Sequence, residues 1–144
     1  FGPLTLQFWN DRNMEQSSGG CFDGGLLEVS TDLGSSWTQV PDAALLTDPY
    51  TGSLSTAWDN PFGGQDAWCG DPRDWTFKVV DLTAYAGQNV TLRFRLGTDS
   101  SVSREGWYID DVRVITPSDC FDNTSIFRDG FESGDLSAWT WSIP

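Results

Sequence analysis

The chain has 144 residues, and its 21 acidic and 8 basic side chains give a formal net charge of -13 without a single histidine. Nucleic acids and anionic membranes are poor partners for such a surface, whereas cations are good ones. Histidine is the commonest general base and transition-metal ligand, so its absence argues against an enzyme. No apolar run is long enough to cross a membrane, so membrane insertion is not expected.

Apolar and polar residues alternate with a period of two, which predicts β-strands, and no long segment has the apolar spacing of a helix. In chain order, the predicted strands lie within residues 4–9, 26–30, 31–40, 75–82, 90–97 and 107–115, the third of them after a turn at Gly34. Residues 41–74 contain four prolines and are predicted to be irregular. Residues 81–88 are predicted to be a connector with one short helical or looped turn.

Many short strands joined by turns rich in glycine and proline predict an all-β fold, a jelly roll or β-sandwich of two antiparallel sheets. We assign residues 1–115 to this sandwich. The polar segment 116–125 is predicted to be a linker, and residues 126–144 a C-terminal strand or tail.

The three cysteines, Cys21, Cys69 and Cys120, include no C-x-x-C pair, which argues against zinc. Cys21 and Cys69 both lie in loops rich in glycine and aspartate, and we expect them to form a disulfide, although three pairings are possible. A disulfide would indicate an oxidising, extracellular setting. Cys120 would then be left for an unidentified partner.

The predicted strand 107–115 contains two carboxylates, although aspartate is a poor strand former. Alternation places Asp110 on the face shared by Tyr108 and two valines, so we expect it to point inward. A buried carboxylate needs a charged partner, hydrogen bonds or a metal. The other acids, and the lack of histidine, favour a hard cation, calcium rather than magnesium if the loops are flexible. The alternative is that Asp110 accepts backbone N–H bonds and orders a loop.

The segments LQFWNDRNMEQ…CFDGGLLEVSTDLGSSWTQV and DLTAYAGQNVTLRFRLGTDSS…GWYIDDVRV resemble the MAM-like jelly-roll domains of bacterial secreted proteins. Immune inhibitor A-type metalloproteases and some subtilases carry such modules. The resemblance covers residues 4–115 and implies a non-catalytic accessory module, often with structural calcium. It places the acidic positions of the family on Glu15, Asp23 and Asp110. Asp99 is a weaker metal candidate, since its side chain can instead cap a turn.

The resemblance fails at the ends of the chain. Family members usually begin with a segment of the form FE-small-small-W, which is missing here, whereas GFESGDLSAW stands at 130–139. Residues 126–144 are therefore either a tag-like tail or the missing edge strand, with Phe131, Leu136 and Trp139 as its apolar contacts. Such a strand could complete its own sheet or that of a neighbouring chain, and the second arrangement gives open filaments.

The irregular segment 41–74 contains the best candidates for ligand-binding aromatics, Tyr50, Trp58 and Trp68, although aromatic side chains more often serve packing. The sequence as a whole predicts a secreted, calcium-stabilised binding or scaffolding module, the C-terminal accessory domain of a larger secreted hydrolase. Its partner would be a protein or a carbohydrate outside the cell. The alternative is a filament subunit assembled by strand exchange through residues 126–144.

Overall fold

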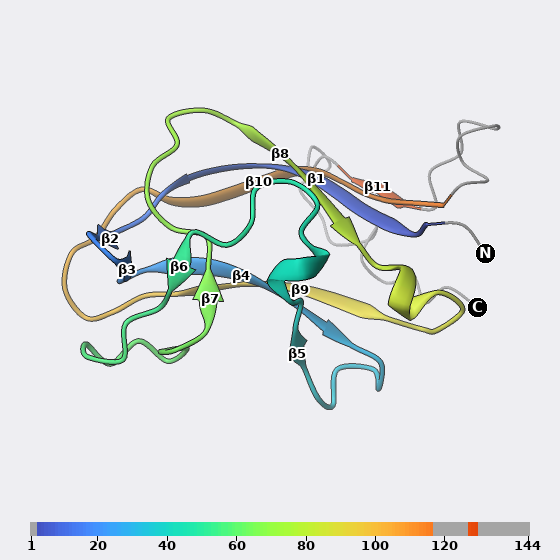
Figure 1. Cartoon of the computed structure of the whole chain (residues 1–144), viewed down its shortest axis with the longest axis horizontal. Coiled ribbons are helices and arrows are strands. Elements are labelled where there is room, and N and C mark those ends of the chain that lie inside the picture. Colours follow the sequence, from blue (N-terminus) through green and yellow to red (C-terminus); the bar gives the residue numbers. More distant parts are fainter. Residues whose placement is uncertain (1–2, 117–126, 130–144) are drawn as a thin grey trace.

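A computed structural model describes residues 3–116 and 127–129, and this part of the chain folds into two layers of antiparallel strands (Figure 1). One sheet has the order β11-β10-β1-β8, and the other has the order β5-β4-β9. The strands of the first sheet are β1 (Thr5–Asn13), β8 (Thr76–Asp81), β10 (Gly106–Ile115) and β11 (Phe127–Asp129). Those of the second are β4 (Gly24–Ser30), β5 (Thr38–Gln39) and β9 (Thr91–Gly97).

Short ribbons and turns complete the fold. The ribbons pair β2 (Gln16–Ser17) with β3 (Gly20–Cys21), and β6 (Gly52–Ser53) with β7 (Asp66–Ala67). Two single 3-10 turns, η1 (Asp42–Ala44) and η2 (Thr83–Tyr85), are the helical elements among the described residues. None of the described helical segments has the length and apolar character needed to span a bilayer.

The core lies between the two sheets. Leu6 and Phe8 of β1 face Leu27 and Val29 of β4, and Trp68 from the long irregular segment packs among them. Alternation explains β1, in which every second residue from Leu6 onward is buried. The predicted all-β fold, a sandwich of antiparallel sheets, is confirmed.

A β-bulge interrupts the pairing of β1 with β10. Gln7 pairs with Arg113 and Trp9 pairs with Asp110, so one residue of β1 stands opposite two residues of β10. Asp111 lies at this point with a φ of 51°, in the left-handed region that aspartate tolerates better than most side chains. The bulge shifts the alternation of β10 by one residue.

The inward orientation predicted for Asp110 is therefore wrong. Before the bulge, Trp107 and Ile109 pack against the core while Tyr108 is exposed, so Asp110 shares the outer face with Tyr108. After the bulge, Val112 is buried in the core again. The sequence argument assumed one unbroken alternation, and the extra residue reversed it.

The predicted disulfide between Cys21 and Cys69 is confirmed, and it joins β3 to the end of the irregular segment. Cys120 lies outside the described residues. Three residues of the predicted C-terminal segment form β11, which pairs with β10 of the same chain. Phe131, Leu136 and Trp139 also lie outside the described residues, so their role in assembly stays a prediction.

Candidate functional site

Three of the four acids predicted to bind metal lie at one end of the sandwich, the left end in Figure 1. Glu15 follows β1, Asp23 precedes β4, and Asp99 follows β9. The sheet register explains this convergence, because Gly24 pairs with Gly97 and so brings the residues beside that pair together. Asp99 is thus far from Glu15 and Asp23 in the sequence and close to them in the fold.

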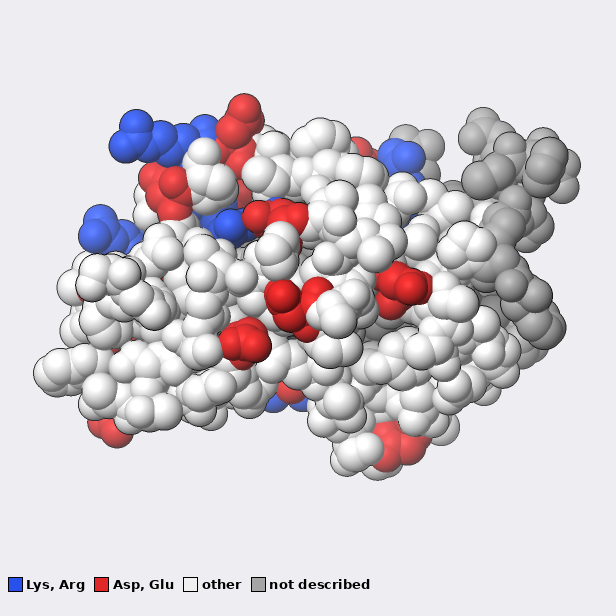
Figure 2. Space-filling model, in the orientation of Figure 1, with Lys and Arg blue, Asp and Glu red and all other residues white. Residues whose placement is uncertain are grey.

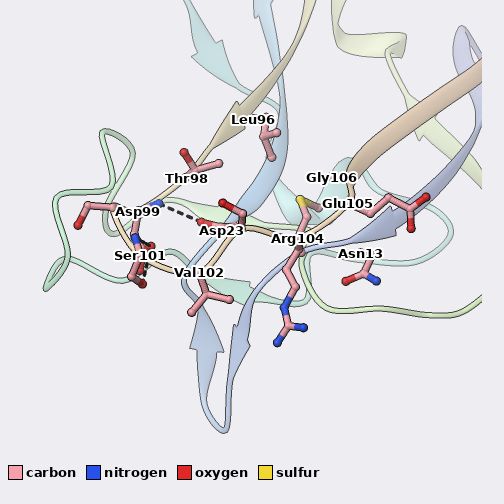
Figure 3. A pocket seen from close by; sticks show the side chains of 13 residues that line it. Asn13, Asp23, Leu96, Thr98, Asp99, Ser101, Val102, Arg104, Glu105 and Gly106 are labelled. Carbon is pink, nitrogen blue, oxygen red and sulfur yellow. Dashed lines mark hydrogen bonds between the residues drawn. The ribbon is translucent and has the colours of Figure 1, made fainter.

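Hydrogen bonds tie the three segments to one another. The carbonyl oxygen of Glu15 accepts bonds from the backbone N–H groups of Phe22 and Asp23, both 3.1 Å long. Asp23 Oδ1 accepts the N–H of Asp99 at 2.9 Å, the contact drawn as a dashed line in Figure 3. Asp99 Oδ1 in turn accepts both the N–H and the hydroxyl of Ser101, at 2.8 and 3.0 Å. The loop after β9 is thus held by carboxylates.

The buried side chain of Asn60 supports the same loop. Asn60 is buried and donates from Nδ2 to the carbonyl of Phe22 at 2.8 Å, while its Oδ1 accepts the N–H of Phe62. A Cβ at Gly97 would lie 2.7 Å from Asn60 Oδ1, so this position requires glycine. The segment around Asn60 therefore packs against Gly97, two residues before Asp99.

Two hollows open at this end of the molecule. The larger, about 330 Å³, is lined by Asp23, Asp99 and the loop up to Gly106, and its side chains are shown in Figure 3. The smaller, about 250 Å³, is lined by Glu15, Phe22, Trp58, Asp99 and Ser101. Asp99 and the Ser101 that bonds to it line both hollows, so Asp99 is the acid at the centre of the candidate site.

Two carboxylate oxygens at the smaller hollow are buried without a hydrogen-bond partner, Oε2 of Glu15 and Oδ2 of Asp99. A buried oxygen without a partner is unfavourable, and a hard cation would satisfy it. The residues therefore fit calcium in ligand chemistry. They do not form a finished cage, because no group of three or more acidic, histidine or cysteine side chains is arranged to hold a metal in the described part of the chain.

Asp110 does not join this group, since it lines neither hollow. It stands in the middle of β10, opposite Trp9, and its Oδ1 accepts the N–H of Asp111 at 2.7 Å. This is the alternative that the sequence left open, a carboxylate that orders its own backbone, here at the bulge.

Two of the three aromatic candidates for ligand binding pack in or against the core. Trp68 is fully buried, with its ring centre 4.6 Å from that of Tyr50. The Tyr50 hydroxyl donates to the carbonyl of Val40 at 3.1 Å and is not available to a ligand. Both side chains pack in this way because the irregular segment folds back onto the core, and their role in ligand binding stays a prediction. Trp58 is 56% exposed and lines the smaller hollow.

A buried cluster of charges escaped the sequence analysis. Lys78 is fully buried and forms an ion pair with Asp48, and its Nζ donates to Thr76 Oγ1 at 2.8 Å. Arg12 is also buried, lies 3.2 Å from Asp48 Oδ2, and donates from Nε to the carbonyl of Cys69 at 3.0 Å. Burial and then the charge of Arg12 lower the pKa of Lys78 to about 7. Alternation could have revealed the burial of Lys78, because Lys78 and the buried Val80 lie on the same face of β8.

A second cluster lies on the other sheet. Glu28 of β4 is buried and receives two arginines of β9, Arg93 at 2.6 Å and Arg95 at 3.4 Å. The guanidinium of Arg93 lies 3.8 Å from the ring centre of Trp37, and that of Arg95 lies 3.9 Å from the ring centre of Phe62. Each arginine therefore combines a carboxylate with an aromatic face.

Comparison with known proteins relates the chain to short segments of two peptidases. Over 111 residues, 77% of this chain, it is 33% identical to bacillopeptidase F of Bacillus subtilis (strain 168), and the match covers 6% of that protein. Over 68 residues, 46% of this chain, it is 40% identical to the pre-pro-metalloprotease PrtV of Vibrio cholerae serotype O1, and covers 7% of it. No family model matches the chain. The chain is thus homologous to a small part of much longer proteins.

Proposed function

We propose that this chain is a non-catalytic, calcium-stabilised binding or scaffolding module that works outside the cell as an accessory part of a larger secreted hydrolase. The observation that carries the proposal is the extent of the similarity, which reaches only 6% and 7% of the two peptidases. A piece of that size without histidine is consistent with an accessory segment rather than a peptidase domain. The disulfide supports an oxidising location.

We further propose that calcium binds where Glu15, Asp23 and Asp99 converge. Glu15 and Asp99 would each supply the oxygen that now lacks a partner, while Asp23 would hold the Asp99 backbone in place. Calcium takes about six to eight oxygen ligands, so backbone carbonyls and water would complete the shell. When bound, the ion would neutralise converging carboxylates and fix the loop after β9. Its role would be stability, not chemistry on a substrate.

The experiment is thermal unfolding of the whole chain, with its disulfide intact, in calcium, in magnesium and in EDTA. A ligand that binds only the folded state at roughly 100 times its Kd adds about 2.7 kcal/mol to the free energy of unfolding. For a domain of this size the melting temperature should then rise by about 8 °C in calcium. Equal melting temperatures in calcium and EDTA would refute the calcium part of the proposal.

Four variants locate the calcium effect. Asp99→Asn and Glu15→Gln should remove most of the calcium-dependent rise in melting temperature, because each removes a ligand charge. Asp81→Asn is the matched control, since it removes a half-exposed acid at the opposite end of β1, beside Thr5. Asp110→Asn tests whether Asp110 is a calcium ligand, as the sequence analysis predicted. The variant should keep the calcium-dependent rise in melting temperature if Asp110 lies outside the site, and lose it if Asp110 is a ligand.

A further inference from the structure

The outer face of the β10-β1-β8 sheet carries three exposed aromatic side chains, which we name the aromatic face: Trp9, Phe77 and Tyr108. Their exposed fractions are 40%, 40% and 46%. Trp9 pairs with Phe77 across the strands, with ring centres 5.2 Å apart. Tyr108 lies on β10 two residues from Asp110, the residue opposite Trp9. Exposed rings that adjoin one another on one sheet face form an apolar patch, and such patches often mark interaction surfaces.

Carboxylates alternate with these rings. Asp110 is the cross-strand partner of Trp9, and Asp11 is the cross-strand partner of Tyr108, so two of the three rings have an acid on the neighbouring strand, whereas Phe77 pairs with Trp9. The nearby Arg113 lies 3.6 Å from Asp111, not from Asp110 or Asp11. Among the described side chains, neither Asp110 nor Asp11 takes part in an ion pair.

The same combination occurs elsewhere in the molecule with its cation in place. On the other sheet, Arg93 lies over Trp37 and bonds to Glu28, so one guanidinium occupies both a ring face and a carboxylate. Cation–π attraction and ion pairing reinforce each other in such an arrangement. At Trp9 and Asp110 the ring and the carboxylate are present, and no cation of the described chain occupies them.

The charge of the rest of the surface points the same way. Arg12 and Lys78 are buried, and Arg93, Arg95 and Arg113 form ion pairs within the chain. Figure 2 shows acidic side chains spread over the visible face of the molecule, while basic ones gather mainly along its upper edge, the side on which β8, β1 and β10 lie in Figure 1. Arg73 and Arg104 are exposed and form no ion pair with the described side chains, yet the net charge of the whole chain is -13, which favours a positively charged partner.

We propose that the aromatic face binds an extended, arginine-bearing polypeptide segment, with a guanidinium on Trp9 and Phe77 that also pairs with Asp110. A second basic side chain pairs with Asp11 beside Tyr108. The inference rests on the proposed role as a binding module and names the chemistry of its partner. It does not depend on calcium, because the aromatic face and the acids around Asp99 use different residues.

The test is a binding titration of the whole chain, disulfide intact and in calcium, with a labelled peptide of alternating arginine and serine. A peptide of alternating glutamate and serine is the charge control. The arginine peptide should bind and the glutamate peptide should not, and added salt should weaken the complex. Loss of the stacking ring in Trp9→Ala should weaken binding about tenfold. Asp110→Asn, which conserves shape, should weaken it by a similar order.

Matched controls keep the outcome interpretable. Leu33→Ser removes an apolar side chain that is 83% exposed in the turn after β4, and Asp59→Asn removes an exposed acid, so neither should change affinity. Equal binding by all variants would overturn the proposal. So would a Trp9-dependent response to chitooligosaccharides without one to the arginine peptide, or Trp9-dependent dimers in sedimentation. The calcium-dependent melting temperature, measured on the same variants, shows separately whether the proposed function holds.

Discussion

The two charge clusters of this protein each combine one carboxylate with two cations, but they differ in which charge is buried. In the first, Glu28 is the deep member, with its side chain 7% exposed, and Arg93 and Arg95 are 32% and 33% exposed. In the second, Arg12 and Lys78 are the deep members, 6% and 1% exposed, and Asp48 is 35% exposed.

This difference decides which side chain is indispensable. A charge near solvent is partly hydrated, and it can turn to water when its partner is lost. A buried charge has no such option, so the loss of its partner exposes the full cost of its desolvation. Around Glu28, two arginines can move outward. Around Asp48, the two cations stay inside the sandwich.

The largest effect is therefore expected for Asp48→Asn. The substitution leaves Arg12 and Lys78 buried side by side without a counter-charge, which should lower the free energy of unfolding by about 3–5 kcal/mol. Backbone strain does not contribute, because Asp48 has a φ of 47° and asparagine tolerates that region equally well. Urea unfolding of the oxidised chain measures the change. A loss below about 1 kcal/mol would show that the cations are hydrated or neutral.

Glu28→Gln should be the milder substitution. The amide still accepts a hydrogen bond from Arg93, and both arginines can reach water while remaining stacked on Trp37 and Phe62. We expect a loss of about 1–3 kcal/mol in the same urea experiment. A loss larger than that of Asp48→Asn would contradict the claim that losing a partner costs more when the charges left behind are buried.

Much of the fold could be predicted from the sequence, because strands with one buried face record it as alternation. The disulfide partners were also predictable, since both lie in similar loops. What could not be predicted depends on the pairing of distant strands. A bulge leaves no local signal, so Asp110 was placed inside, whereas the pairing of Gly24 with Gly97 is what joins Asp23 to Asp99.

The buried cations were missed for a related reason. The first predicted strand was ended at Trp9, yet β1 continues to Asn13, and the alternation then buries Arg12. Lys78 has the inward phase of its strand, but a lysine in that position is usually read as exposed. Only the approach of Asp48, from a loop between the strands, makes the position tolerable.

Lys78→Met should have the smallest effect of the three substitutions, and its sign should depend on pH. The pKa of Lys78 falls from 10.5 to about 7 on folding, so between these values the unfolded chain binds more protons than the folded one. The wild-type protein should therefore gain stability as pH rises from about 7 toward 10, and its lysine should be most unfavourable below pH 7.

A methionine fills similar volume without a charge to bury, and it leaves Asp48 paired with Arg12 alone. The variant should be as stable as the wild type or more stable by about 1 kcal/mol at pH 6, with the advantage shrinking toward pH 9. Urea unfolding across this range, wild type against variant, isolates the contribution of Lys78 from that of every other titrating group. A variant that is less stable at pH 6 and equally so at pH 9 would mean that the ammonium is held charged by Asp48, so that depth alone does not set its pKa.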